Sequence, residues 1–219
     1  MHHLFDKIVT YKALIPVKSL DTAKSRLAEH LTLSQREMLV LDMLHHVLHI
    51  LCKSELFEQI SVVSPDKQVL ERAGAWGAKA LEEEQPGHNP SLHAAALKDK
   101  GSGATALLTI SADLPLLCIS DIRNLIEQST QHSVVLAPSH EGTGTNAILV
   151  RPALAVPYLF GPHSLQRYQQ AAQQRQLSST LYHSLGLALD IDTIEDLCEL
   201  RRLDCKFQEE IELAACDFR

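Results

Sequence analysis

Residues 111–117 read Ser-Ala-Asp-Leu-Pro-Leu-Leu, and the rest of the chain is organised around them. The apolar segment before it, 105–110, predicts a buried strand, although its pattern alone does not distinguish a strand from a short buried helix. Pro115 cannot donate a ladder hydrogen bond and therefore helps to end the strand. Asp113 then either lies at the C-terminal end of a central strand, where open α/β sheets bind ligands, or is an ordinary turn or capping residue.

Further apolar and amphipathic segments alternate along the chain. Besides 105–110, the strand candidates are 13–17, 60–63, 79–81, 133–137, 147–150 and 187–191. Helical spacing marks 34–51, 67–73, 91–97, 165–174, 193–202 and a segment that starts at Ser120. The longest helix is expected to begin at a capping box formed by Ser34 and Glu37. This alternation predicts right-handed crossovers and a largely parallel sheet.

Composition narrows the class of protein. The chain has 219 residues and a formal net charge of -7, with a pI near 5.9. This length fits a single domain over 1–219, with a helical tail from 203. An acidic chain argues against general nucleic-acid binding, which needs a basic surface. Five cysteines without a Cys-x-x-Cys pair favour reduced thiols, and we expect a cytoplasmic protein with no signal peptide and no membrane span.

Three cations follow the first strand candidate: Lys18, Lys24 and Arg26. Such a loop could bind a polyphosphate, with Arg26 able to bond two oxygens at once, or it could be an ordinary solvated loop. The acidic run 82–84 is typical of a solvated face. Asn89 lies in an expected loop, where its amide could read a base edge or serve as a common turn residue.

Later in the chain, the segment 141–146 is rich in Gly and Thr and could bring backbone amides close to anionic oxygens. It matches neither a P-loop nor a dinucleotide fingerprint. Gly161 and Ser164 precede a helix and suggest either a second anion site or a simple turn and N-cap.

Asp190 and Asp192 lie at the end of the last strand candidate. In a strand they would share one face, and two oxygen ligands on one face suit Mg²⁺. Either aspartate could instead be a cap. Thr193 is expected to cap the next helix, with Asp196 three residues on.

Several motifs occur in a specific order. They are IPVK at 15–18, AKSRL at 23–27, ADLPLL at 112–117, GTNA at 144–147, FGPHS at 160–164 and LDIDTIEDL at 189–197. Together, over residues 13–202, they resemble the 2-phospho-lactate guanylyltransferase family of coenzyme F420 biosynthesis.

The resemblance implies an α/β fold, with a mostly parallel mixed sheet flanked by helices. This is the Rossmann-like nucleotidyltransferase fold of the glycosyltransferase A type. It implies transfer of GMP from GTP to a phosphorylated three-carbon acid, with release of pyrophosphate. In family members the acceptor is 2-phospho-L-lactate, phosphoenolpyruvate or 3-phospho-D-glycerate. Relatives are often dimers, and the segment 147–150 and the C-terminal tail offer a homodimer interface.

The resemblance also assigns roles to residues. The metal carboxylates, for Mg²⁺, fall on Asp113, Asp190 and Asp192. The nucleotide-binding and catalytic cations fall on Lys18, Lys24 and Arg26. The acceptor-binding positions fall on Thr145 or its neighbour Asn146, Gly161 and Ser164. Base recognition falls on Asn89, where residues 88–91 read His-Asn-Pro-Ser and depart from the family's Leu-Asn followed directly by a small residue.

Two alternatives remain at this stage. One is an enzyme of the same fold with another base or acceptor; such enzymes usually carry a glycine-rich loop after the first strand, which 19–25 lacks. The other is a non-catalytic nucleotide-binding protein, against which the three aspartates and the basic loop argue.

Overall fold

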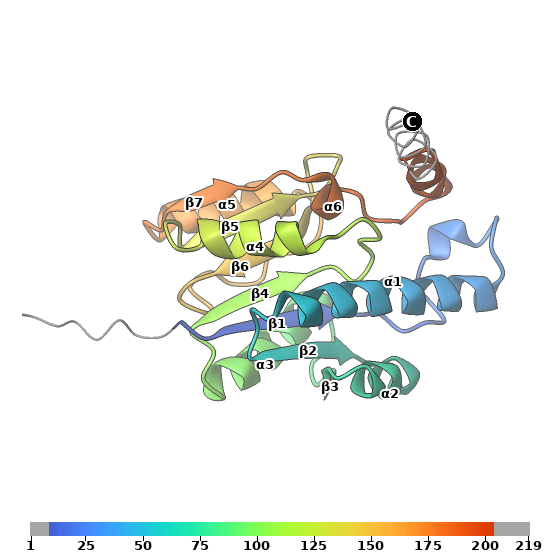
Figure 1. The fold of residues 1–219 in the computed structure, drawn as a ribbon, viewed down its shortest axis with the longest axis horizontal. Helices are drawn as coiled ribbons and strands as arrows, with labels where there is room; N and C mark the ends of the chain where they lie inside the picture. The colour runs from blue at the N-terminus through green and yellow to red at the C-terminus, as the bar shows by residue number, and fades with distance from the viewer. Residues whose placement is uncertain (1–8, 204–219) are drawn as a thin grey trace, which may run out of the picture.

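The computed structural model describes residues 9–203, in which seven strands form one mixed sheet. The strands are β1 (Tyr11–Pro16), β2 (Gln59–Ser64), β3 (Lys79–Glu82), β4 (Ala106–Ile110), β5 (Val134–Pro138), β6 (Thr145–Val150) and β7 (Ser179–Leu181). Their order is β3-β2-β1-β4-β6-β5-β7, and only β6 runs against its neighbours (Figure 1). The predicted α/β class and the largely parallel sheet are confirmed.

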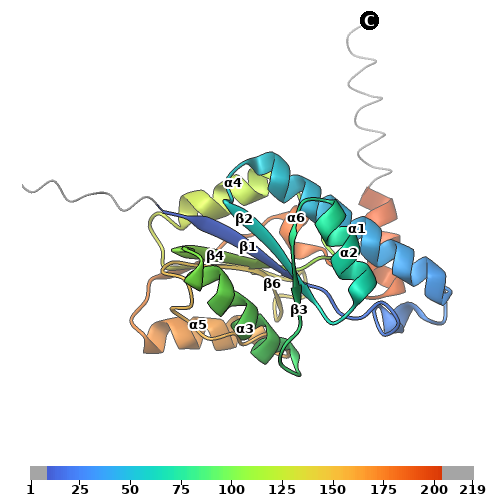
Figure 2. The ribbon, with the colours of Figure 1, turned by 90° about the horizontal axis from the view of Figure 1, so that it is seen from below.

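Helices cover both faces of the sheet. They are α1 (Leu33–Ser54), α2 (Lys67–Ala75), α3 (His88–Gly101), α4 (Ile119–Gln128), α5 (Ser164–Gln174) and α6 (Leu185–Ala188), with a 3-10 turn η1 (Ser25–Leu27). Figure 2 shows α1, α2 and α4 on one face and α3 and α5 on the other. The central strands are buried on both faces, which explains why their sequences are continuously apolar.

The N-cap of the longest helix lies two residues earlier than expected. Thr32, not Ser34, is the N-cap of α1, and it forms the capping box with Gln35 rather than Glu37. Its face toward the sheet is apolar: Leu44, Leu48 and Leu51 are buried, and Leu41 is partly buried.

Two other predictions near functional residues are wrong. Helix α3 begins at His88 rather than Ser91, so Asn89 lies in the first helical turn and not in a loop. The expected strand 187–191 is instead the end of α6 followed by irregular chain, and strand β7 was missed. The apolar side chains of that segment are buried although the segment is not a strand. A short apolar run does not show whether it forms a strand, a helix or irregular chain.

The C-terminal part of the described chain is helical from 194 to 203. Thr193 and Asp196 cap this helix reciprocally, as predicted: the Thr193 N–H donates to Asp196 at 2.7 Å, and the Asp196 N–H donates to Thr193 Oγ1 at 3.4 Å. The predicted helical tail beyond 203 lies outside the described residues.

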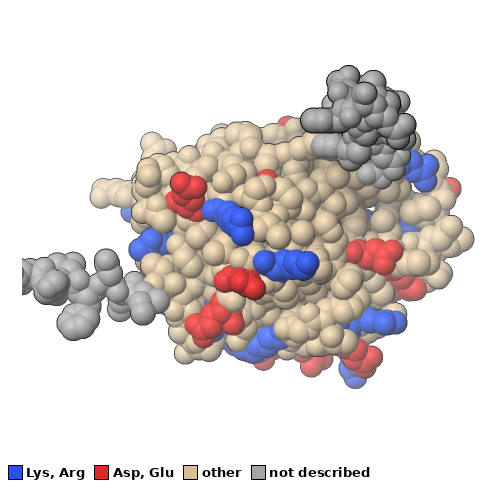
Figure 3. Space-filling model, in the orientation of Figure 1, with Lys and Arg blue, Asp and Glu red and all other residues tan. Residues whose placement is uncertain are grey.

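Charges of both signs are interspersed over the face that carries α1 and α4 (Figure 3). Within residues 9–203, no helix combines the length and apolarity that a membrane crossing requires.

Candidate functional site

A cavity of about 810 Å³ lies at the carboxyl ends of the parallel strands. Its wall includes Lys18 after β1, Asp113 after β4 and Asp192 from the segment that follows α6. Strand β6 contributes its first residues, because an antiparallel strand begins at the edge where its neighbours end; Ile110 of β4 pairs with Ala147. The fold therefore gathers residues from the whole length of the chain at one edge of the sheet.

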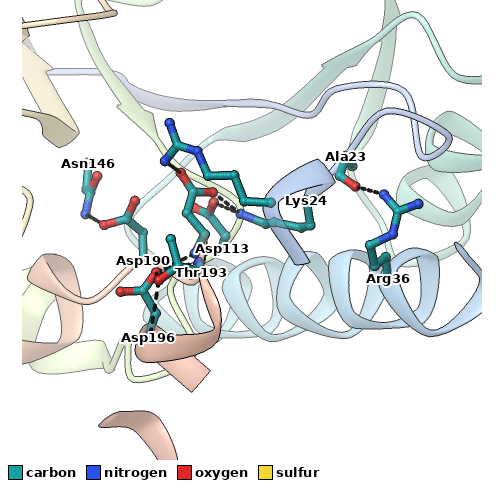
Figure 4. A network of polar contacts seen from close by, with 10 residues as sticks. Ala23, Lys24, Arg36, Asp113, Asn146, Asp190, Thr193 and Asp196 are labelled. Atoms are coloured by element: carbon teal, nitrogen blue, oxygen red, sulfur yellow. Dashed lines mark hydrogen bonds and ion pairs between the residues drawn. The ribbon is translucent and has the colours of Figure 1, made fainter. Parts of the chain in front are cut away.

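Lys24 joins two of the predicted metal carboxylates. Its ammonium group donates to the Asp113 carboxylate and, over 2.9 Å, to Asp192 Oδ1 (Figure 4). The Lys24 side chain is only 8% exposed, so this is a largely buried contact. Arg26 Nη1 lies 3.8 Å from Asp192 Oδ2 and is largely exposed. Two of the three predicted cations thus meet two of the three predicted carboxylates.

The third carboxylate, Asp190, is positioned by β6. The Asn146 side-chain amide donates to Asp190 Oδ1 at 2.9 Å (Figure 4). It also donates to the carbonyls of Leu187 and Ala188, each at 3.1 Å. The Ile191 N–H donates to the Asp113 carbonyl at 3.2 Å. Asp190 and Asp192 therefore reach the cavity from an irregular segment fastened to β6 and to the end of β4, and not from a shared strand face.

The pKa shifts reflect this arrangement. Burial raises the pKa of Asp190, and the nearby charge of Asp113 raises it further. Burial alone would also raise the pKa of Asp192, but the ammonium of Lys24 outweighs it and lowers that pKa. Burial alone would lower the pKa of Lys24, but Asp113 and Asp192 outweigh it, so the pKa of Lys24 is raised. The carboxylates carry more negative charge than Lys24 neutralises.

The donor chemistry suits magnesium, since all three carboxylates offer oxygen ligands and Asp190 is destabilised by its neighbours' charge. Within the described chain, however, no three His, Cys, Asp or Glu side chains form a preformed metal-ligand cluster, and Lys24 occupies the contact between Asp113 and Asp192. The magnesium site on Asp113, Asp190 and Asp192 stays a prediction.

The loop that carries the cations is held from two sides. Asp66, the N-cap of α2, accepts from the Leu20 N–H at 2.9 Å, and Arg36 of α1 donates to the Ala23 carbonyl at 2.9 Å (Figure 4). Lys24 itself has a positive φ of 53° at the start of η1. Lys18 is exposed and lines the cavity with Lys24.

The predicted acceptor residues lie together in the same cavity. Thr145 and Ser164 are buried, and the Ser164 hydroxyl donates to Thr145 Oγ1 at 3.1 Å. Gly161 precedes α5 with φ +119°, a conformation that a side chain would strain. Asn146 also lines the cavity, but its amide nitrogen is engaged by the 187–190 segment. Of the two neighbours, Thr145 is therefore the better candidate for direct contact with an acceptor.

Asn89 is not among the residues that line the cavity. Its side-chain nitrogen donates to the Phe160 carbonyl at 3.0 Å, and its side-chain oxygen accepts from the Phe160 N–H at 2.9 Å. It thus ties α3 to the loop before α5. Base recognition by Asn89 stays a prediction. Both the oxygen and the nitrogen of its side-chain amide already form hydrogen bonds with the Phe160 backbone.

The structure adds Glu83 to the cavity wall, where the acidic run 82–84 predicted only a solvated face. Glu83 directly follows β3, as Asp113 closely follows β4. Applying the rule for strand ends to β3 would have found it, but a run of three glutamates hides the one that faces inward.

Comparisons with known proteins show the family to which the chain belongs. A family model described as "Guanylyl transferase CofC like" matches residues 11–203. The phosphoenolpyruvate guanylyltransferase of Sphaerobacter thermophilus is 40% identical over 192 residues, covering 88% of this chain and 93% of that protein. The 2-phospho-L-lactate guanylyltransferase of Methanothermobacter thermautotrophicus is 35% identical over 188 residues, covering 86% and 82%.

Solved structures support the fold. A nucleotidyl transferase from Methanothermobacter thermautotrophicus superposes with a TM-score of 0.64 at 12% identity, covering 90% of this chain and 99% of that one. The 4-diphosphocytidyl-2C-methyl-D-erythritol synthase of Anaerococcus prevotii gives a TM-score of 0.60 at 11% identity, covering 87% and 93%. The predicted nucleotidyltransferase fold is confirmed.

Proposed function

Because the chain belongs to the CofC-like guanylyl transferase family, we propose that its cavity transfers GMP from GTP to a small phosphorylated carboxylic acid in coenzyme F420 biosynthesis. The observation that carries the proposal is the meeting of Lys24 with Asp113 and Asp192 in the cavity that also holds Thr145 and Ser164. One cavity thus offers cations and carboxylates for a triphosphate beside hydroxyls for a second substrate.

The reaction needs no side-chain nucleophile. An oxygen of the acceptor phosphate attacks the α-phosphorus of GTP, a new phosphorus–oxygen bond forms, and the bond to the β-phosphate breaks. Pyrophosphate leaves with the electron pair of that bond. The protein contributes positioning and charge stabilisation. In this scheme Lys18, Lys24 and Arg26 stabilise the charge on the leaving pyrophosphate.

Asp113, Asp190 and Asp192 are the residues that would hold Mg²⁺, which would supply positive charge to the reacting phosphates when bound. Asn146 helps to position these carboxylates, because its side-chain amide donates hydrogen bonds to the Asp190 carboxylate and to the Leu187 carbonyl. Its role is positioning rather than direct contact with the acceptor.

Thr145, Gly161 and Ser164 are proposed to bind the acceptor. Phosphoenolpyruvate and 2-phospho-L-lactate are the acids named for the relatives, and 3-phospho-D-glycerate completes the set to be tested. The deciding experiment incubates the protein with GTP and Mg²⁺, offers each acid separately, and identifies the GMP adduct by mass. We expect one adduct and an equal amount of pyrophosphate.

The same assay separates the alternatives. Pyrophosphate release with ATP, CTP or UTP but not with GTP would indicate a same-fold enzyme for another base. GTP binding without release from any acceptor would indicate a non-catalytic nucleotide-binding protein and would overturn the proposal.

A cytoplasmic location and a homodimer belong to the same proposal. The expected interface at 147–150 is wrong, because that segment is buried in β6 between β4 and β5. Cys52, Cys118 and Cys198 are exposed free thiols, which fits a reducing compartment. Cell fractionation and light scattering on the purified chain test the two points separately.

A further inference from the structure

The order of the strands arranges the candidate binding groups in a row along the cavity. The assignment of these groups to parts of the nucleotide rests on the proposed function. Lys18 and Lys24 follow β1, Asp113 follows β4, and Thr145 begins β6. These residues account for the triphosphate and the acceptor. The wall at the ends of β2 and β3 is then the part left for the nucleoside.

The register of the strands brings the ends of β2 and β3 to the same edge of the sheet as the end of β1, which the proposed phosphate-binding cations follow. Pro16 of β1 pairs with Val63 of β2, and Ser64 pairs with Glu82 of β3. From β3 to β4 there are three strand spacings of about 4.8 Å, or about 14 Å in total. A base beside β3 and phosphates beside β4 therefore fit an extended nucleotide.

Glu83 is the charged residue that this wall offers. It lines the cavity and is half-buried, and its own N–H continues the strand pairing by donating to the Ser64 carbonyl at 3.2 Å. Within residues 9–203 its carboxylate has no hydrogen-bond or ion-pair partner. Glu84, by contrast, lies outside the cavity and pairs with Lys98 at 2.7 Å.

The surroundings of Glu83 suit a base. Pro65 offers exposed apolar surface on the cavity wall, which the nearly fully buried Val63 and Leu92 also line, and apolar surface can cover a face of a purine. Asn89, the position that the family resemblance assigned to the base, is engaged by the Phe160 backbone. His88 and Ser91 also line the cavity, but Glu83 supplies the carboxylate on this part of the wall for the polar edge of the base.

We propose that the Glu83 carboxylate accepts hydrogen bonds from guanine N1–H and from the exocyclic N2 amino group, and that this contact selects GTP. A carboxylate can only accept hydrogen bonds, and guanine presents two adjacent donors on this edge. Adenine and cytosine present a ring nitrogen acceptor at the corresponding place. The carboxylate therefore attracts guanine and repels these two bases.

The test compares Glu83→Gln with Glu84→Gln, using GTP and inosine triphosphate, which lacks the N2 amino group. For Glu83→Gln we expect kcat/KM with GTP to fall roughly 10- to 100-fold, because hydrogen bonds to a charged group are lost. The loss should appear mainly in KM, and the wild-type preference for GTP over inosine triphosphate should approach unity. Glu84→Gln should retain both the activity and the preference.

An unchanged preference in Glu83→Gln, with wild-type melting behaviour, would overturn the inference while leaving the proposed function intact. If wild-type protein forms no GMP adduct, the proposed function fails instead. Equilibrium binding of the two nucleotides to wild type and Glu83→Gln then decides the role of Glu83, and equal discrimination by both proteins would refute it. Glu83→Ala, which removes the carboxyl group altogether, should lose the preference as well.

Discussion

At the scale of single residues, Lys24 is a nearly buried cation that contacts two carboxylates in the cavity. Removing it would take the shared cation from Asp113, whose side chain is 22% exposed, and from Asp192, which is 48% exposed and keeps Arg26 at 3.8 Å. Breaking a buried ion pair costs more than the pair itself contributes, because the remaining charge stays desolvated. A Lys24 substitution would therefore mix stability and activity, whereas Asp113→Asn leaves Lys24 paired with Asp192 and probes the chemistry more directly.

Asp113→Asn should reduce turnover roughly 10²-fold or more, in line with the loss of one transition-state electrostatic contact. The substitution keeps the shape of the side chain and removes its charge. Pyrophosphate release at saturating GTP measures the effect, with thermal unfolding as the control for folding. Near-normal turnover by this variant would refute a role for Asp113 in metal binding.

At the scale of elements, Asp66 connects the cation-bearing loop to α2. It accepts from the Gln68 N–H at the start of the helix and from the Leu20 N–H in the loop, each at 2.9 Å. Burial alone would raise the pKa of Asp66, but the N–H donors of Leu20, Gln68 and Val69 outweigh it and lower that pKa. The ionised carboxylate is therefore the form that stabilises the fold.

Asp66→Ala should reduce the free energy of unfolding by about 1 kcal/mol at pH 7, the usual cost of losing an N-cap. Because the pKa of Asp66 is lower in the folded state, the stabilisation by its charge is present above the unfolded pKa of about 3.9. It is lost as the pH falls through the folded value. Urea unfolding at pH 7 and below pH 4 should show the difference shrinking in acid.

Asp66→Asn is the matched control, because asparagine caps helices well without a charge. It should retain the helix cap through its one carbonyl oxygen, lose the second oxygen that accepts from the Leu20 N–H, and remove the acid dependence that Asp66 contributes. An Asp66→Ala deficit that stays constant with pH would contradict the electrostatic part of the argument.

Helix α6 depends on close approach to the chain before α4. A Cβ atom added to Gly186 would lie 2.3 Å from Asp121 Oδ2 and 2.7 Å from the Leu116 carbonyl oxygen. Since the backbone oxygen cannot rotate away, α6 would have to shift, and with it the segment that carries Asp190 and Asp192.

Gly186→Ala should therefore destabilise the protein by about 1–3 kcal/mol, as overpacking does. It should also reduce turnover, because the two aspartates follow α6. Gly74→Ala in α2 is the control: nothing lies within 4 Å of its added Cβ, and alanine favours a helix more than glycine. Thermal unfolding should rank Gly74→Ala above wild type and Gly186→Ala below it; equal melting of the two variants would disprove the packing argument.

At the scale of the whole molecule, ligand binding should link the stability of the different elements that line the cavity. The cavity wall includes residues from β1, β4, β6 and the 190–196 segment, so a ligand that contacts all of them stabilises the folded chain as a unit. Elements far apart in sequence would then unfold together.

GTP with Mg²⁺ at about 100 times its Kd should add about 2.7 kcal/mol to the free energy of unfolding. For a chain of this size, each kcal/mol raises Tm by about 2–4 °C. Differential scanning fluorimetry measures the shift, and EDTA should remove much of it if Asp113, Asp190 and Asp192 bind the metal. A shift that EDTA leaves unchanged would indicate nucleotide binding without the proposed ion.

The sequence predicted the class of fold well, because the buried strands are continuous apolar runs and the long helices have clear periodicity. It failed where a short segment is ambiguous: 187–191 is apolar in alternation, yet it packs as a helix end and irregular chain. Likewise, Thr32 and Ser34 are both acceptable caps, and local sequence does not choose between them.

For the site, the sequence alone identified the candidate residues: the cations of 18–26, the three aspartates and the hydroxyls of Thr145 and Ser164, whose roles stay predictions. Their partners became visible in the folded chain. It placed Lys24 on Asp113 and Asp192, engaged Asn89 and Asn146 with backbone groups, and turned Glu83 toward the cavity. The reason is physical: the type of a residue limits the bonds it can form, but strand order and register bring distant residues within bonding distance.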